Sequence, residues 1–280
     1  MGPYAFAGGT AVLTGAASGI GEALAAQLAA RGSHLVLLDR DAERLEAVAA
    51  RIRAGAPALR VATTVVDLAD DAATARVAAT LVAEHPETTL LVNNAGVALG
   101  GRFDQVTLEE FDWVMAVNFR AVVRLTHALL PVLKTHPGAH VVTVSSVFGI
   151  FAPAGQAAYA ASKFAVRGFS ESLRHELAQD GIGVTVVHPG GIRTRIAESA
   201  RIGSGVDPAE YERGREQFAK LLRMPPEDAA ARIIAAIERR RPRLLIGWSA
   251  TVPDLLVRLL PGSYWRLIAR RAAPATPPSA

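Results

Sequence analysis

Short runs of β-branched residues and leucine alternate with longer alanine-rich segments of helical period along most of this chain. Such alternation predicts βα units that pack on a parallel sheet. Seven strands are expected, at Thr10–Leu13, His34–Asp39, Leu59–Val66, Thr89–Asn93, His140–Ser145, Gly183–His188 and Arg243–Ile246. Helices are expected at Ile20–Arg31, Asp41–Ala54, Asp71–Glu84, Leu108–Lys134, Ala157–Asp180 and Glu227–Arg239. Because crossovers between parallel strands are right-handed, these units predict an α/β fold with a doubly wound, Rossmann-type, seven-stranded parallel sheet flanked by helices.

The chain is expected to form one domain followed by a C-terminal extension. Its 280 residues, half of them hydrophobic, suffice for one core, which we place in residues 1–250. Residues 251–272 are expected to form an amphipathic helical extension, and the tail APATPPSA at 273–280 is expected to be disordered.

Composition argues against several classes of site. The chain has no cysteine, which excludes disulfides, thiolate metal sites and cysteine nucleophiles. His136 and His140 form the one close pair of histidines, but Pro137 and Gly138 between them prevent a helical ligand face, so no metal site is expected. No stretch approaches 18 uncharged apolar residues and the N-terminus lacks the pattern of a signal peptide, so a cytoplasmic location is expected.

The net charge of +4 is concentrated near the C-terminus. Between Glu238 and Arg271 eight arginines stand against two acids, which leaves about −2 for the rest of the chain. No aromatic side chains interleave with these arginines as in a strand-binding groove, so nucleic-acid binding is not expected.

The turn after the first expected strand, TGAASGIG, is rich in glycine. Ligands of doubly wound sheets bind at the carboxyl ends of the strands. Gly15, Gly19 and Gly21 would let the backbone bend and bring the N-terminus of the next helix against a pyrophosphate. The spacing departs from the G-x-G-x-x-G fingerprint, so a glycine-rich turn that binds nothing is the alternative for this turn taken alone.

The second expected strand ends in Asp39, eighteen residues after Gly21. A carboxylate there can accept hydrogen bonds from both hydroxyls of an adenosine ribose and repel a 2′-phosphate, which favours NAD over NADP. Arg40 works against this preference, because a guanidinium can pair with a phosphate. The alternative is that Arg40 is a solvated residue that opens the next helix. No basic residue stands at Ser18 to help hold a phosphate, so NAD is favoured.

Polar and small residues follow the third and fourth strands. Asp67, in VDLAD, can receive an adenine amino group or can cap the helix after the strand. The stretch Asn93-Asn94-Ala95-Gly96 would let backbone lie close to an adenosine while asparagine side chains tie neighbouring turns together.

The motif YAASK at 159–163 places a phenol and an ammonium about one helical turn apart. A lysine ammonium near Tyr159 favours the phenolate and lowers the tyrosine pKa toward the operating pH, as a general acid/base requires. Ser146 lies thirteen residues before Tyr159, in the loop after the fifth strand. The alternative is an exposed Tyr159–Lys163 pair on a helix surface, with Ser146 as a plain loop residue.

Together these motifs resemble the short-chain dehydrogenase/reductase family in its compact single-domain form. TGAASGIG is similar to the family's TGxxxGIG, NNAG to its strand-four motif, YAASK to YxxxK and HPGGIRT to PGxxxT, over about Thr10 to Thr194. The resemblance implies that Tyr159 is the acid/base, that Lys163 tunes it and binds nicotinamide-ribose hydroxyls, and that Ser146 orients the substrate oxygen. It also implies that Asn118 bends its helix and so helps to hold a proton-relay water.

The resemblance further implies a nicotinamide dinucleotide as cofactor, which we expect to be NAD rather than NADP. In the family, the segment after strand six seats the carboxamide. The cofactor-binding residues expected on this basis are Gly15, Ser18, Gly19, Ile20, Gly21, Asp39, Arg40, Asp67, Leu68, Asn94, Ala95, Gly96, Tyr159, Lys163, Pro189, Gly190, Ile192 and Thr194.

The expected function is therefore hydride transfer between the nicotinamide and a secondary alcohol or ketone. A non-catalytic nucleotide-sensing or scaffold protein on the same fold is the alternative, but it would not need the set Ser146, Tyr159 and Lys163. A serine hydrolase is not expected, because the chain has no G-x-S-x-G elbow.

Two segments bear on the substrate. Residues 195–225, with glycines at 203, 205 and 214, are expected to form a mobile lid. Phe148, Ile150 and Phe151 follow Ser146 and suggest a lipophilic substrate, although they could instead pack the lid.

The extension should present an apolar face with leucines at 255, 256, 259 and 260, then a break at Pro261-Gly262 and a second amphipathic turn from Trp265 with Arg266, Arg270 and Arg271. Burial against another subunit is favoured over contact with an anionic membrane surface. The resemblance implies a homodimer or homotetramer built on the helices near 108–134 and 157–180.

Overall fold

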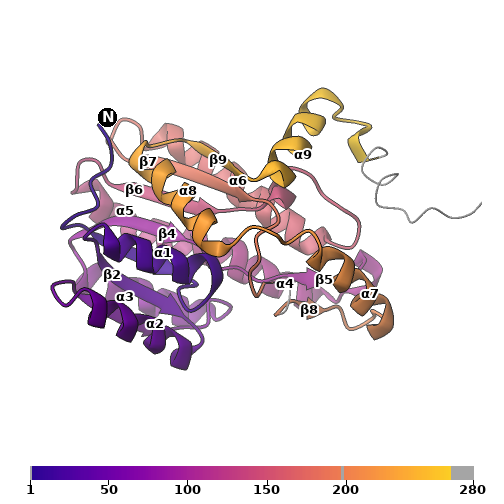
Figure 1. Ribbon diagram of the computed structural model, residues 1–280, viewed down its shortest axis with the longest axis horizontal. Coiled ribbons are helices and arrows are strands. Elements are labelled where there is room, and N and C mark those ends of the chain that lie inside the picture. Colours follow the sequence, from indigo (N-terminus) through magenta and orange to yellow (C-terminus); the bar gives the residue numbers. More distant parts are fainter. Residues whose placement is uncertain (1, 197–198, 266–280) are drawn as a thin grey trace, which may run out of the picture.

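The protein, described by a computed structural model for residues 2–196 and 199–265, is a parallel sheet covered by helices on both faces (Figure 1). Its seven strands follow the order β3-β2-β1-β4-β6-β7-β9 and all pair in parallel. They are β1 (Thr10–Thr14), β2 (His34–Asp39), β3 (Val61–Val65), β4 (Thr88–Asn93), β6 (His140–Val144), β7 (Gly183–Pro189) and β9 (Arg243–Ile246). The predicted doubly wound fold is confirmed.

The helices lie between the strands as the sequence predicts. They are α1 (Gly19–Ala30), α2 (Ala42–Gly55), α3 (Asp71–Glu84), α4 (Leu108–Met115), α5 (Ala121–Lys134), α6 (Ala157–Glu176), α7 (Pro208–Ala219), α8 (Pro226–Glu238) and α9 (Trp248–Leu259). Short turns of helix occur at η1 (Phe103–Gln105), η2 (Ala116–Arg120) and η3 (Val147–Gly149).

Several element ends follow from capping residues in the sequence. Asp41 and Asp70 accept hydrogen bonds from the backbone N–H groups of Arg44 and Ala73, and so cap α2 and α3. Thr107 and Glu110 form a reciprocal capping box at the start of α4. These caps satisfy N–H groups that a helix cannot pair internally.

Three features of the fold were not predicted. The expected helix Leu108–Lys134 is interrupted by the π-helical turn η2, which contains Asn118. The segment after β7 contains α7 and the short strand β8 (Arg201–Ile202), which pairs in parallel with β5 (Leu99–Gly100). Helix α9 begins at Trp248, before the predicted start of the extension at residue 251.

Two apolar cores lie on the two faces of the sheet. One contains side chains of α1, α2 and α8, such as Leu28, Leu45 and Ile233. The other contains side chains of α3, α5 and α6, such as Leu81 and Leu129. Strands β1, β6 and β7 are buried along their whole length because helices cover both faces, which explains their continuous apolar runs.

An 18-residue stretch within the helical run Leu108–Lys134 has a mean hydropathy of 1.2, enough to match the composition of a membrane-spanning helix. It is 56% buried within the fold, and α5 packs on α3 and β4. We therefore interpret this run as a core helix that covers one face of the sheet.

Candidate active site

The glycine turn between β1 and α1 is closely packed against the end of β4. Gly15 has a φ of +67°, a left-handed conformation that side chains other than glycine rarely adopt. A Cβ atom on Gly21 would lie 1.9 Å from the carbonyl oxygen of Gly15. Only glycine permits this close packing of backbone at the N-terminus of α1. A helix N-terminus with unpaired N–H groups suits an anionic group such as a pyrophosphate.

Asn94 ties this turn to the end of β4. Its Nδ2 atom donates to the carbonyl oxygens of Thr14 (3.0 Å) and Gly15 (3.1 Å). In return, the Thr14 hydroxyl accepts hydrogen bonds from the backbone N–H groups of Asn94 and Ala95, each at 3.0 Å. This arrangement agrees with the expectation that asparagine joins neighbouring turns, but the sequence reasoning missed Thr14.

Asp39 lies at the end of β2 beside the same turn. Its Oδ2 atom accepts a hydrogen bond from the backbone N–H of Ala17 at 3.0 Å, and its Oδ1 atom accepts from Asp41 at 3.1 Å. The carboxylate is thus fixed at the position where an adenosine ribose is expected, while the neighbouring Arg40 is exposed.

Asp67 and Leu68 follow β3. Asp67 is exposed, and its carboxylate accepts only from the backbone N–H of Ala69 among the contacts of the described chain, at 2.9 Å. Asp70, not Asp67, caps α3, so capping does not explain Asp67. Leu68 is buried in the core on the α3 face, which leaves its backbone rather than its side chain for a cofactor.

The segment after β7 returns to the glycine turn. A Cβ atom on Gly19 would lie 3.1 Å from Cγ2 of Thr194, so Thr194 contacts the start of α1. Pro189 ends β7, Gly190 donates its N–H to the carbonyl oxygen of Ile246 at 3.0 Å, and Ile192 is buried. Ser18, which precedes α1 without a side-chain capping hydrogen bond in the described chain, and Ile20 are half-buried in the same region.

Ser146, Tyr159 and Lys163 converge at the ends of β6 and α6. Ser146 caps η3, and its Oγ accepts from the N–H of Phe148 at 3.1 Å. Its hydroxyl interacts with the hydroxyl of Tyr159. Lys163 lies one turn further along α6, with Nζ 5.6 Å from the centre of the Tyr159 ring. Tyr159 is only 9% exposed and Lys163 only 3%, so the alternative of an exposed helix pair is wrong.

Asn118 shapes the π-helical turn η2. Its Oδ1 accepts from the N–H of Val97 at 2.8 Å, and its Nδ2 donates to the carbonyl oxygen of Val97 (2.9 Å) and to Ser162 (3.0 Å). A Cβ atom on Gly96 would lie 3.1 Å from Nζ of Lys163 and 3.3 Å from Oδ1 of Asn118. The loop after β4 therefore lies directly against two of the expected catalytic residues.

The neighbouring Ser145 has a different role from Ser146. Its hydroxyl donates to the backbone carbonyl oxygen of Lys163 at 2.8 Å and is buried, so Ser145 holds α6 against β6. Of the two serines, only Ser146 forms a side-chain hydrogen bond with Tyr159 in the described chain. The choice of Ser146 over Ser145, made from its spacing to the tyrosine, agrees with this geometry.

The electrostatics differ from the sequence-based expectation. Burial raises the pKa of Tyr159, and the hydroxyl of Ser146 is the group that opposes this rise. Burial also lowers the pKa of Lys163 to about 8, and its Nζ donates to the carbonyl oxygen of Val144 at 3.1 Å. The expected lowering of the tyrosine pKa is therefore wrong for this form of the protein, because desolvation of the buried phenol raises the pKa.

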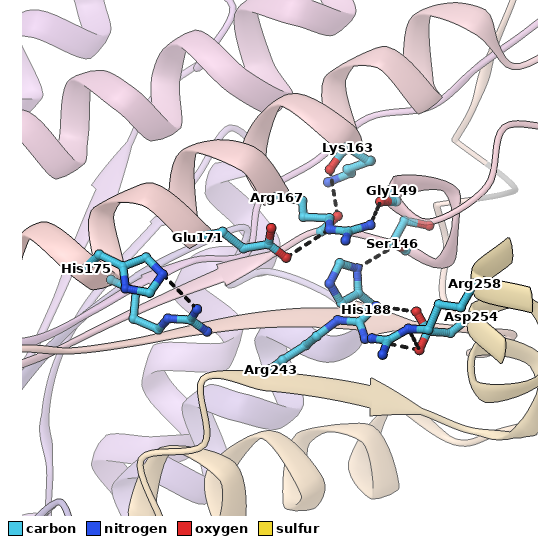
Figure 2. A network of polar contacts seen from close by, with 12 residues as sticks. Ser146, Gly149, Lys163, Arg167, Glu171, His175, His188, Arg243, Asp254 and Arg258 are labelled. Atoms are coloured by element: carbon cyan, nitrogen blue, oxygen red, sulfur yellow. Dashed lines mark hydrogen bonds and ion pairs between the residues drawn. The ribbon is translucent and has the colours of Figure 1, made fainter. Parts of the chain in front are cut away.

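A polar network lies behind Ser146 (Figure 2). His188 of β7 contacts the carbonyl oxygen of Ser146, and Arg167 of α6 contacts the carbonyl oxygen of Gly149. Arg243 of β9 pairs with Asp254 of α9. Sequence reasoning missed His188, because nothing in its spacing to the YAASK motif marks it.

Comparison with known proteins identifies the family of this chain. The family model for short chain dehydrogenases matches residues 9–204. The chain is 38% identical over 271 residues to SadH of Mycobacterium tuberculosis, whose name describes an oxidoreductase, and the match covers 96% of each protein.

Two solved structures are similar over nearly their whole length. A short-chain dehydrogenase/reductase from Burkholderia phymatum in complex with NAD has a TM-score of 0.81 and 27% identity, over 99% of this chain and 100% of that one. A short-chain dehydrogenase from Sphingobium yanoikuyae in complex with NADPH has a TM-score of 0.76 and 29% identity, over 97% and 98%.

Proposed function

The chain belongs to the short-chain dehydrogenase family and is an NAD(P)-dependent oxidoreductase, and from this premise we propose that it interconverts a secondary alcohol and a ketone with Tyr159 as general acid/base. One observation carries the proposal. The hydroxyls of Ser146 and Tyr159 meet in a buried site, and the amine of Lys163 lies 5.6 Å from the centre of the phenol ring.

The nicotinamide, when bound, supplies the hydride acceptor or donor. In the oxidative direction the phenolate of Tyr159 takes the proton of the substrate hydroxyl, and in the reductive direction the phenol returns it. Ser146 donates a hydrogen bond to the substrate oxygen and holds it near the phenol. Lys163 binds ribose hydroxyls of the cofactor and, when protonated, favours the phenolate. Asn118 keeps η2 in its π-helical form, because its amide is held by Val97 and Ser162.

We infer a preference for NAD over NADP from Asp39. Its carboxylate is held by two backbone N–H groups and cannot easily turn away from a 2′-phosphate beside it. Arg40 is exposed and could approach a phosphate, so it opposes this preference. The solved relatives contain NAD in one case and NADPH in the other.

We infer a lipophilic substrate from the ring of Phe148. It stands edge-on to Tyr159, with centroids 6.0 Å apart, whereas Ile150 and Phe151 are buried and contribute to packing. Part of the segment expected to form a lid packs against α4 and β5. The guanidinium of Arg201 lies 3.8 Å from the centre of the Trp113 ring, and Gly203 donates its N–H to the carbonyl oxygen of Gly100 at 2.8 Å. The mobility of the lid stays a prediction.

The test is a panel of alcohols and ketones assayed at the reduced-nicotinamide absorbance band with NAD(H) and NADP(H). We expect turnover of bulky apolar secondary alcohols, with kcat/KM at least about tenfold higher for NAD than for NADP because of the charge on Asp39. Turnover of small polar polyols alone would refute the lipophilic assignment, and a preference for NADP would refute the role given to Asp39.

We further propose that α9 packs against a second copy of the chain. Trp248, Val252, Leu255 and Leu259 lie on one face of this helix, and Trp248 is 69% and Leu259 68% exposed. The helix projects from the body of the protein (Figure 1). Arg266, Arg270 and Arg271 lie outside the described residues. The exposed apolar side chains of α9 favour an apolar partner over an anionic membrane.

Replacing Leu255 and Leu259 together by serine should therefore lower the oligomeric state measured by analytical ultracentrifugation. The exposed Val65 on the edge strand β3 provides the control, since Val65→Thr should leave the assembly unchanged. If the double variant keeps the assembly of the parent protein, the interface proposal is wrong. Co-sedimentation of the parent, but not of this variant, with anionic vesicles would assign the face to a membrane instead.

A further inference from the structure

The mechanism leaves one buried titratable group beside the site unused, the imidazole of His188. It is fully buried at the end of β7, and its Nδ1 atom lies 3.1 Å from the carbonyl oxygen of Ser146. Burial lowers its pKa to about 4, and the hydrogen bond to that carbonyl opposes this effect. The charges of Arg243 and Arg167 lower the pKa by smaller amounts, and Glu171 raises it slightly. The ring is therefore neutral at pH 7, and Nδ1 must carry the proton because a carbonyl can only accept.

The other ring nitrogen of His188 and one donor of the neighbouring Arg243 are both unpaired within the described ranges. With Nδ1 protonated, Nε2 is an acceptor, and it has no partner among the described residues. The Nε–H donor of Arg243 is likewise buried without a partner in the described chain. Figure 2 shows the imidazole between Ser146 and the side chain of Arg243, whose Nη1 and Nη2 atoms hold the carboxylate of Asp254.

Two side chains contact backbone carbonyl oxygens of the turn that carries Ser146. His188 holds that of Ser146, and Nη1 of Arg167 holds that of Gly149 at 3.3 Å, while Glu171 fixes the same guanidinium. A reacting group must be held to within about 0.5 Å, and a displacement of 1 Å can lower the rate about 100-fold.

We propose that His188 is a positioning residue for Ser146 and that it connects the turn of this serine to the Arg243–Asp254 ion pair in the middle of α9. The inference rests on the proposed function, because that function gives Ser146 its role. It adds no new step to the reaction. According to this proposal, the ion pair that anchors α9 also helps to fix the position of the Ser146 hydroxyl, which orients the substrate.

Three replacements of His188 separate its two nitrogens. The amide nitrogen of asparagine can occupy the position of Nδ1, that of glutamine lies nearer to Nε2, and leucine removes both. We expect His188→Leu and His188→Gln to lower kcat by about 30- to 100-fold with nearly unchanged affinity for NAD, and His188→Asn to stay within about threefold of the parent enzyme. Equal losses in the asparagine and glutamine variants at equal Tm would overturn the proposal.

The pH profile distinguishes positioning from a general loss of stability. Because the Ser146 hydroxyl lowers the pKa of Tyr159, a loosened Ser146 should move the rise of the oxidation rate with pH to higher pH in the leucine and glutamine variants. His140, a second fully buried histidine bonded to Thr185, is the matched control. His140→Leu should lower Tm but leave the pH profile in place, and identical profiles for His140→Leu and His188→Leu would contradict the proposal.

The link to α9 is tested by Asp254→Asn in two backgrounds. This change should lower kcat about five- to tenfold in the parent enzyme and cause no further loss in the His188→Leu variant, because the same connection is already broken. Independent, multiplicative losses would remove Arg243 and Asp254 from the proposal. Tyr159→Phe is assayed in parallel: if it remains active, the proposed function itself fails, whatever the histidine variants do.

Discussion

Replacing Tyr159 by phenylalanine should lower kcat by about three powers of ten or more and leave the affinity for NAD nearly unchanged. The change removes one oxygen atom from a ring that is 9% exposed, so the packing of Phe148 against it remains. It also removes the only hydroxyl that meets Ser146 in the described part of the site. General acid/base catalysis contributes about 10²–10⁴-fold, and the loss of substrate orientation adds to it.

The measurement is single-turnover hydride transfer at saturating cofactor, with the dissociation constant of NAD determined separately. Tyr4→Phe is the matched control, because Tyr4 is also buried and donates to or accepts from the hydroxyl of Thr89 at 2.9 Å, far from the site in the fold. The control should lose some stability and retain its rate. A Tyr159→Phe enzyme that keeps most of its turnover would show that another group transfers the proton.

The strands and the motif residues could be predicted because their signals are local. A parallel strand buried on both faces has an unbroken apolar run, as in Leu90–Val92, and a capping side chain such as Asp70 marks the start of a helix. The turns at the carboxyl ends then gather at one edge of the sheet by topology alone. For this reason Gly15, Asn94 and Thr194 could be assigned to one site although they are far apart in the sequence.

The features that the sequence did not reveal depend on contacts between distant segments. Strand β8 exists because Arg201 donates its N–H to the carbonyl oxygen of Ala98 at 3.0 Å and stacks on Trp113. Neither partner follows from a periodic pattern. The pKa of Tyr159 likewise depends on how completely the helices exclude water from the phenol, a property of the packed protein and not of the spacing to Lys163.

Replacing Lys163 by methionine should abolish efficient turnover and, at the same time, stabilise the cofactor-free protein at pH 7. Burial lowers the pKa of Lys163 from 10.5 to about 8, so the folded protein holds an ammonium in a site that disfavours its charge. Such a shift corresponds to on the order of 3 kcal/mol of lost stability. The hydrogen bond to the carbonyl oxygen of Val144 is lost in the variant and offsets about 1 kcal/mol of the gain.

The pH dependence of this effect has a defined sign. Between pH 8 and pH 10.5 the unfolded chain binds more protons at this lysine than the folded protein does, so this contribution to stability improves as the pH rises through that window. The full cost is present below pH 8. The advantage of Lys163→Met in the free energy of unfolding should therefore be largest at pH 7 and shrink at pH 9.5, as measured by urea denaturation.

Lys220→Met is the matched control, because Lys220 is exposed in the lid segment and its replacement should change neither stability nor rate appreciably. If Lys163→Met is less stable than the parent protein at pH 7, packing around the ammonium outweighs its desolvation and the stability argument is wrong. If the variant is more stable but still turns over at the parental rate, Lys163 is not part of the catalytic set. The expected pair of results, a gain in stability with a loss of activity, would show that this buried amine is retained for its chemistry and against the stability of the fold.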